Sequence, residues 1–178
     1  MQALLKTPFN GPWLKLDQPT SVLVATTPAD VRQCLIDAED AAQQGAYVAG
    51  FVTYEASSAF GLPLPTTQSG LLPAACFGVF PKNQVVAGGE ELLATPNNSV
   101  LDELTQSWST PLKQQDYIKK IHSIKDHIAA GDTYQLNFTF RLRTPFSGSS
   151  LNLFTQLVSA QRGEWSAYLD LGDYAICS

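Results

Sequence analysis

The chain is poor in cysteine, in cations and in long apolar runs. Its 178 residues include three cysteines, an odd number spread widely along the sequence, which favours reduced thiols over a disulfide framework. Eleven lysines and arginines face sixteen acidic residues, and a formal net charge of -5 without a basic cluster argues against nucleic acid as a partner. No apolar run reaches the roughly 18 residues that a membrane helix needs, and the N-terminus lacks a signal-peptide pattern. We therefore expect a soluble cytoplasmic protein with no nucleic-acid or membrane partner.

Residues that commonly bind metals or act as nucleophiles are few and poorly spaced. His122 and His127 are the two histidines, and their separation of five does not place both rings on one face of a helix. Ser57 and Ser58 have no histidine nearby in the sequence to activate them. Glu55 is either a ligand carboxylate or, more commonly at such a position, a helix-cap acid or ion-pair partner. We therefore assign no catalytic residue and no metal ligand to this chain.

The first half of the chain alternates between strand and helix signals. Residues 22–25 read as a short buried strand, and Thr27 with Pro28 marks the start of a helix through an N-cap and a proline at the first helical position. Gly45 ends that helix. Residues 47–54 form a nearly continuous apolar run, which predicts a strand that is buried on both faces.

The middle of the chain predicts a hairpin, a loop and a linker. Residues 74–80 and 84–87 read as strands, and the turn chemistry of residues 81–83 favours joining them as a hairpin. The polar stretch 94–111 is the best candidate for an internal linker. A proline-rich region predicts loop or sheet edge around Pro63, Pro65 and Pro73.

The second half predicts two helices and a closing hairpin. An apolar stripe at helical spacing predicts an amphipathic helix that Gly131 ends in a left-handed conformation; its members are Tyr117, Ile121, Ile124 and Ile128. A second helix begins at Ser149 or Ser150, and residues 165–171 and 174–177 pair around a Gly172-Asp173 turn. The fold class is therefore α+β, with mixed, mostly antiparallel sheets packed with helices.

The most informative segment follows Gly131. Residues 134–142 alternate apolar and polar side chains, which predicts a strand with one face for each kind. Gln135 and Asn137 share the polar face, and amides are poor surface strand formers. Their face is either solvated or lines a small polar pocket. We expect Asp132 to cap the preceding turn through its side chain.

Three segments together resemble a known family. The pattern I-x-x-G-D-x-Y-Q-x-N from Ile128 to Asn137, with a leucine at position 142, resembles the signature of the aminodeoxychorismate (para-aminobenzoate) synthase component I family. The resemblance extends more distantly to the anthranilate and isochorismate synthases. Residues 50–56 are similar to a glycine-aromatic-tyrosine-glutamate-alanine segment of the para-aminobenzoate branch, and residues 166–173 to the strand that leads to the family's S-P-E motif.

The resemblance implies an enzyme that is larger than this chain. Such enzymes aminate chorismate to 4-amino-4-deoxychorismate in para-aminobenzoate and folate biosynthesis, with ammonia from a glutamine amidotransferase subunit. The family's chorismate site, its activating lysine and its magnesium ligands lie in the C-terminal half. The resemblance implies that residues 1–178 are a single N-terminal fragment of the two-lobed anthranilate synthase component I-like sandwich. We expect this fragment to be inactive by itself. The resemblance places Tyr134, Gln135 and Asn137 near the interior between the sheets as ligand-binding residues.

Two other interpretations stay open at this point. The chain could belong to an anthranilate synthase component I, although residues 22–25 lack the L-L-E-S pattern with which that branch binds tryptophan. It could also be a non-catalytic module that binds a small ligand or a protein. Because residues 174–178 form an apolar strand without a polar tail, we expect a truncated sheet edge and self-association of the fragment.

Overall fold

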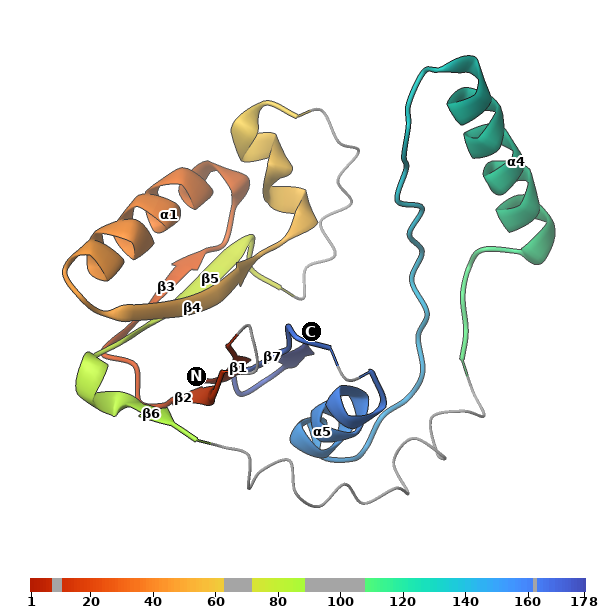
Figure 1. The fold of residues 1–178 in the computed structure, drawn as a ribbon. Helices are drawn as coiled ribbons and strands as arrows, with labels where there is room; N and C mark the ends of the chain where they lie inside the picture. Colours follow the sequence, from red (N-terminus) through yellow and green to blue (C-terminus); the bar gives the residue numbers. More distant parts are fainter. Residues whose placement is uncertain (8–10, 63–71, 89–107, 162) are drawn as a thin grey trace. The chain divides into compact units, whose positions relative to one another are not determined.

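The structure is a computed structural model that describes residues 1–7, 11–62, 72–88, 108–161 and 163–178 (Figure 1). The chain divides into two compact units, one made of Met1–Pro96 with Ser150–Ser178 and the other of Asn97–Ser149. Helices and two antiparallel sheets make up the described residues, which confirms the α+β class. No helix among these residues is long and apolar enough to span a membrane.

The first unit contains a three-stranded antiparallel sheet in the order β3-β5-β4. Its strands are β3 (Ser21–Ala25), β4 (Tyr47–Val52) and β5 (Ala75–Phe80), and helix α1 (Pro28–Gln43) packs against them (Figure 1). The core between helix and sheet consists of small side chains, which allows a close approach; it includes Ala25, Val31, Cys34, Ala56, Ala74 and Ala75.

The ends of α1 follow from local sequence, as predicted. The Asp30 carboxylate accepts hydrogen bonds from the Thr27 backbone N–H at 3.3 Å and from the Thr27 hydroxyl at 2.7 Å. The Asp30 backbone N–H bonds back to the Thr27 carbonyl at 3.2 Å, which satisfies helix-end groups that would otherwise lack partners. Gly45 follows the helix with a φ of +92°.

The prediction that residues 47–54 are buried on both faces is wrong. β4 is an edge strand in which Ala49 alone is fully buried, whereas five of the six residues of β5 are buried. The central position of β5 between two neighbours explains the difference. β4 ends at Val52, and Tyr54, which is 82% exposed, begins the 3-10 helix η1 (Tyr54–Phe60).

The second sheet of this unit has five antiparallel strands in the order β6-β2-β1-β7-β8. They are β1 (Gln2–Lys6), β2 (Trp13–Leu16), β6 (Val85–Ala87), β7 (Ala167–Asp170) and β8 (Ala175–Cys177). Helix α5 (Ser150–Gln161) packs on the sheet, where the Phe154 ring lies edge-on to Trp13 at 5.9 Å. The β7–β8 hairpin around Gly172 is confirmed, but the sequence analysis did not predict β1 or β2.

The predicted hairpin of residues 74–80 and 84–87 is also wrong. β5 pairs with β3 and β4, while β6 pairs with β2 in the other sheet. The 3-10 helix η2 (Lys82–Gln84) separates β5 from β6, so the connection joins two sheets. A favourable turn sequence does not determine which strand becomes the partner.

The second unit contains helix α4 (Gln114–Ala130), which ends as predicted at Gly131 with a φ of +82°. The apolar stripe of α4 is only half covered in this unit, because Ile121 and Ile124 are half-buried and Tyr117 and Ile128 are 39% and 41% exposed.

The strand predicted after α4 differs most from the structure. Residues 134–142 are not assigned to a strand in the described structure, and the isolated bridge between Ser109 and Arg143 lies just beyond them. Leu136, Phe140 and Leu142 are 47%, 45% and 52% exposed. Alternation alone does not make a strand, because the backbone groups also need a neighbouring strand as partner.

Two predicted features fall on residues that the structure does not describe. The loop at Pro63 and Pro65 lies outside the described residues, as does most of the candidate linker 94–111. The described end of that stretch includes Ser109, whose backbone N–H donates to the Arg143 carbonyl at 2.7 Å. The boundary between the two units, at Pro96, falls within the stretch.

Candidate functional site

The candidate site begins where α4 ends. The Gly131 backbone N–H donates to the Ile128 carbonyl at 3.1 Å, and the Asp132 backbone N–H donates to the His127 carbonyl at 3.0 Å. This pair of bonds is a Schellman motif, and it requires the left-handed conformation that glycine adopts without strain. The chain therefore leaves the helix in a defined direction.

The side chain of Asp132 turns back to the helix. One carboxylate oxygen lies 2.8 Å from Nδ1 of His127, and the two side chains are 61% and 60% exposed. A histidine in the last helical turn also lies near the negative end of the helix dipole, where positive charge is favourable. Asp132 thus contacts the helix through its side chain, but its partner is the His127 ring and not a backbone group of the turn, so the predicted side-chain cap is wrong.

The three predicted ligand-binding residues follow immediately and are exposed. The Thr133 hydroxyl donates to the Gln135 carbonyl at 2.9 Å, and the Gln135 side-chain amide donates to the Asn137 side-chain oxygen at 3.4 Å. Tyr134 is 93% exposed. The structure therefore brings Gln135 and Asn137 together, whereas the ligand-binding role of all three stays a prediction.

An aromatic cluster holds the next part of the segment against α4. The Tyr117 ring lies 5.7 Å from Phe138 and 5.8 Å from Phe140 between centroids, and Phe138 lies 6.2 Å from Phe140. Such separations are typical of favourable aromatic pairs. The sequence analysis found the apolar stripe of α4 and the alternation of the segment, but did not pair the two.

The structure explains why a glycine stands at position 50, in the segment 50–56. A Cβ on Gly50 would lie 2.0 Å from the carbonyl oxygen of Cys76 and 2.7 Å from the Cα of Phe77 on the neighbouring β5. Glycine is therefore the residue that this close approach of two strands tolerates. Glu55 lies half-buried in the first turn of η1, and the Ser57 hydroxyl oxygen is buried without a hydrogen-bond partner.

The segment 166–173 contains β7, and one of its side chains is hydrogen-bonded to helix α5. The Tyr168 hydroxyl lies 2.8 Å from the Ser150 hydroxyl and 3.5 Å from the Asp170 carboxylate. Burial raises the pKa of Tyr168, the bond with Ser150 lowers it, and nearby Asp170 raises it further. Because the net shift is upward, the phenol keeps its proton and can continue to donate to these partners.

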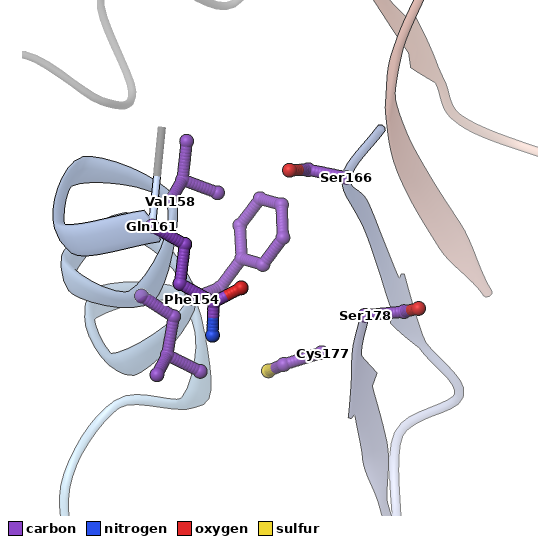
Figure 2. Close-up of a pocket in the computed structure, with 7 residues that line it drawn as sticks. Phe154, Val158, Gln161, Ser166, Cys177 and Ser178 are labelled. Carbon is purple, nitrogen blue, oxygen red and sulfur yellow. The ribbon is translucent and has the colours of Figure 1, made fainter. Parts of the chain in front are cut away.

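Helix α5 and the ends of β7 and β8 line a second candidate site, a partly open pocket of about 250 Å³. Figure 2 shows side chains of α5 facing side chains of the two strand segments across it. Its lining combines apolar with polar residues, namely Phe154, Leu157, Val158, Gln161, Ser166, Cys177 and Ser178. Burial raises the pKa of the Cys177 thiol, which makes it a poor nucleophile.

The described residues offer no evident place for a metal. Among them, no three or more histidine, cysteine, aspartate or glutamate side chains are grouped closely enough to hold an ion. Cys34, Cys76 and Cys177 are all free. A magnesium ion thus finds no ligand set in the part of the chain that the structure describes.

Comparison with known proteins gives consistent matches. A family model described as chorismate binding enzyme matches residues 18–178. Aminodeoxychorismate synthase component 1 of Escherichia coli strain K12 is 33% identical over 75 residues, which are 42% of this chain and 17% of that protein. The Klebsiella aerogenes protein of the same name is 31% identical over the same shares of each chain. Anthranilate synthase component 1 of Streptomyces coelicolor is 28% identical over 40% of this chain and 14% of its own length. The matched segments therefore span less than a fifth of each relative.

Proposed function

Because the chain belongs to the chorismate-binding enzyme family, we propose that it is part of component I of an aminodeoxychorismate synthase. The observation that carries this proposal is the agreement between the family match and the relatives of that name, at 33% and 31% identity. The G-D-x-Y-Q-x-N pattern of residues 131–137 lies inside the matched region and supports the same branch.

The complete protein, on this proposal, aminates chorismate to 4-amino-4-deoxychorismate for para-aminobenzoate and folate synthesis. Its partners are chorismate and a glutamine amidotransferase subunit that supplies ammonia. Magnesium and the reacting groups belong to residues outside this chain. We further propose a cytoplasmic location, which agrees with the three free cysteines.

Tyr134, Gln135 and Asn137 contribute to ligand binding in this proposal. The primary amides of Gln135 and Asn137 each carry two donors and an acceptor, and their one mutual hydrogen bond leaves most of these groups for another partner. Amide donors suit the carboxylate and hydroxyl groups of chorismate. None of the three residues is assigned a catalytic role: the amides of Gln135 and Asn137 do not act as acids or bases near neutral pH, and Tyr134 is proposed for binding alone.

A second candidate function is that of an anthranilate synthase component I. The observation that favours it is the match to the Streptomyces coelicolor enzyme, at 28% identity over 71 residues. Both candidates begin from chorismate but release different products. The product therefore distinguishes them.

The deciding experiment uses the protein from the complete reading frame, with chorismate, magnesium and ammonia, and identifies products by chromatography. We expect 4-amino-4-deoxychorismate. Anthranilate would assign the protein to the second candidate, and the absence of both products would contradict both. The 178-residue chain under the same conditions is the control, and we expect no turnover from it. Turnover by the short chain would disprove our assignment of the reacting groups to residues outside it.

A further inference from the structure

Several local hydrogen bonds follow one another along the chain from the end of α4 to Asn137. His127 Nδ1 lies 2.8 Å from the Asp132 carboxylate, the Thr133 hydroxyl donates to the Gln135 carbonyl at 2.9 Å, and Gln135 donates to Asn137 at 3.4 Å. The Schellman bonds of Gly131 and Asp132 connect the first of these contacts to the helix. Each contact spans at most five residues, so the series depends on this segment alone.

The contacts restrict successive rotations of the chain. The two helix-end bonds fix Gly131, and the contact with His127 holds the side chain of Asp132 back on the helix. The hydroxyl of Thr133 then fixes the carbonyl of Gln135, which limits rotation between these two residues. The backbone at Gln135 is therefore restrained relative to the helix end, and the hydrogen bond to Asn137 restrains the Gln135 side chain.

Beyond Asn137, the segment contacts α4 again through aromatic rings. Phe138 and Phe140 both contact Tyr117, which lies near the start of α4. Gln135 and Asn137 precede these aromatic residues in sequence, and both are exposed. The segment is thus fixed to one helix at two places, and the amide pair lies between them in sequence.

We propose that His127, Asp132 and Thr133 are positioning residues that set the direction in which Gln135 and Asn137 are presented to a ligand. The inference rests on the proposed ligand-binding role of the amide pair and extends it to three residues that do not touch the ligand. Preorganisation of this kind reduces the ordering cost of binding.

The first test measures order in the 178-residue chain by nuclear magnetic resonance. Thr133→Val removes the hydroxyl but keeps the branched shape, Thr133→Ser restores the hydroxyl, and Asp132→Asn removes the charge. In the parent chain and in Thr133→Ser we expect backbone order parameters of about 0.85 at Gln135 and Asn137, and values near or below about 0.6 in the other two variants. His122→Gln, on the exposed surface of α4, is the control and should match the parent.

Low order parameters in the parent chain, or equal values in Thr133→Val and Thr133→Ser, would overturn the positioning role. This readout requires no enzymatic activity. It therefore decides the structural part of the inference even where the proposed chorismate reaction fails.

The second test measures chorismate kinetics in the complete protein with the same variants. We expect Thr133→Val to raise KM roughly threefold to tenfold with little change in kcat, as loss of one net hydrogen bond would, and Thr133→Ser to restore it. An unchanged KM in a variant that has lost local order would overturn the link to the ligand. A fall in kcat with constant KM would overturn it as well.

Discussion

The side-chain amide of Gln135 donates a hydrogen bond to the side-chain oxygen of Asn137 over 3.4 Å, and both residues are exposed. Two residues that the sequence assigned to one face thus lie in contact without a strand to hold them. The pair is available to a ligand because neither amide is used to stabilise a core.

Replacing Asn137 with Leu tests whether the amide pair is enclosed. Because Asn137 is exposed, we expect the free energy of unfolding to change by no more than about 0.5 kcal/mol. Denaturant midpoints of the parent and variant chains measure the difference. A loss of roughly 1 to 3 kcal/mol would instead indicate buried polar partners.

Replacing Phe138 with Ala tests the aromatic cluster. The sequence pattern placed this ring on the apolar face of a strand, but the structure leaves it half-buried against Tyr117. We therefore expect a loss of about 1 to 2 kcal/mol, from partial burial and ring contacts. Phe154→Ala, at a residue that is 1% exposed, is the comparison and should cost about 3 to 5 kcal/mol. Denaturation of the unit that contains each residue measures the loss of unfolding free energy. Equal losses in the two variants would contradict the explanation by burial.

Replacing Gly50 with Ala should strongly destabilise the three-stranded sheet. The added Cβ would meet the Cys76 carbonyl oxygen at 2.0 Å, so β4 and β5 would have to separate. We expect a loss of at least about 3 kcal/mol, at the upper end of overpacking effects. Gly45→Ala is the matched control, because it meets no atom within 4 Å and adds only the strain of a φ of +92°, about 1 to 2 kcal/mol. Thermal unfolding of both variants makes the comparison, and similar losses would disprove the steric explanation.

The folded chain should lose stability in alkaline solution. Burial raises the pKa of Cys34, with the charge of Asp37 as a smaller cause, and burial also raises the pKa of Cys76, with Cys34 adding to it and the N-terminal charge opposing it. A raised pKa means that the folded state retains its proton where the unfolded state loses it. The contribution to stability is therefore complete below the ordinary thiol pKa of about 8.5 and is lost as the pH rises through the folded pKa.

Thermal unfolding between neutral and alkaline pH measures this dependence. We expect Tm to fall above about pH 8.5, and to fall less steeply in a Cys34→Ala, Cys76→Ala double variant. An identical slope in the two proteins would show that other groups cause the alkaline loss.

The isolated chain should associate with itself through the five-stranded sheet. β8 is an edge strand, and its Ala175, Ile176 and Cys177 are only half-buried. Unpaired edges of this kind bind other strands. We expect sedimentation to show dimers or larger species that dissociate on dilution. A monomer at all concentrations that binds no hydrophobic dye would contradict the prediction.

Local signals in the sequence predicted the elements that depend on local contacts. The Thr27 capping box, the left-handed Gly131 and the Gly172 turn each involve residues within a few positions of one another. Long-range pairing was not predictable in this way. β6 follows β5 closely but pairs with β2, and the short strands β1 and β2 carry no strong periodic signal. For the candidate site, the sequence placed Gln135 and Asn137 on one face, and the structure brings the two into contact. Their role in ligand binding stays a prediction. The contact of Tyr117 with Phe138 was not predictable, because it joins a helix to a segment some twenty residues later.

The pairing of β1 with β7 has a consequence for the order in which the chain folds. Leu4 lies opposite Tyr168, so the centre of the five-stranded sheet joins the first residues of the chain to some of the last. Such contacts close a very long loop and are slow to form. The three-stranded sheet, by contrast, uses Ser21 to Phe80 and is complete in sequence long before β7 is synthesised. During synthesis, β1 can therefore pair with β2 early, but its second edge has no partner until β7 is made. An unpaired strand edge is prone to pair with another chain.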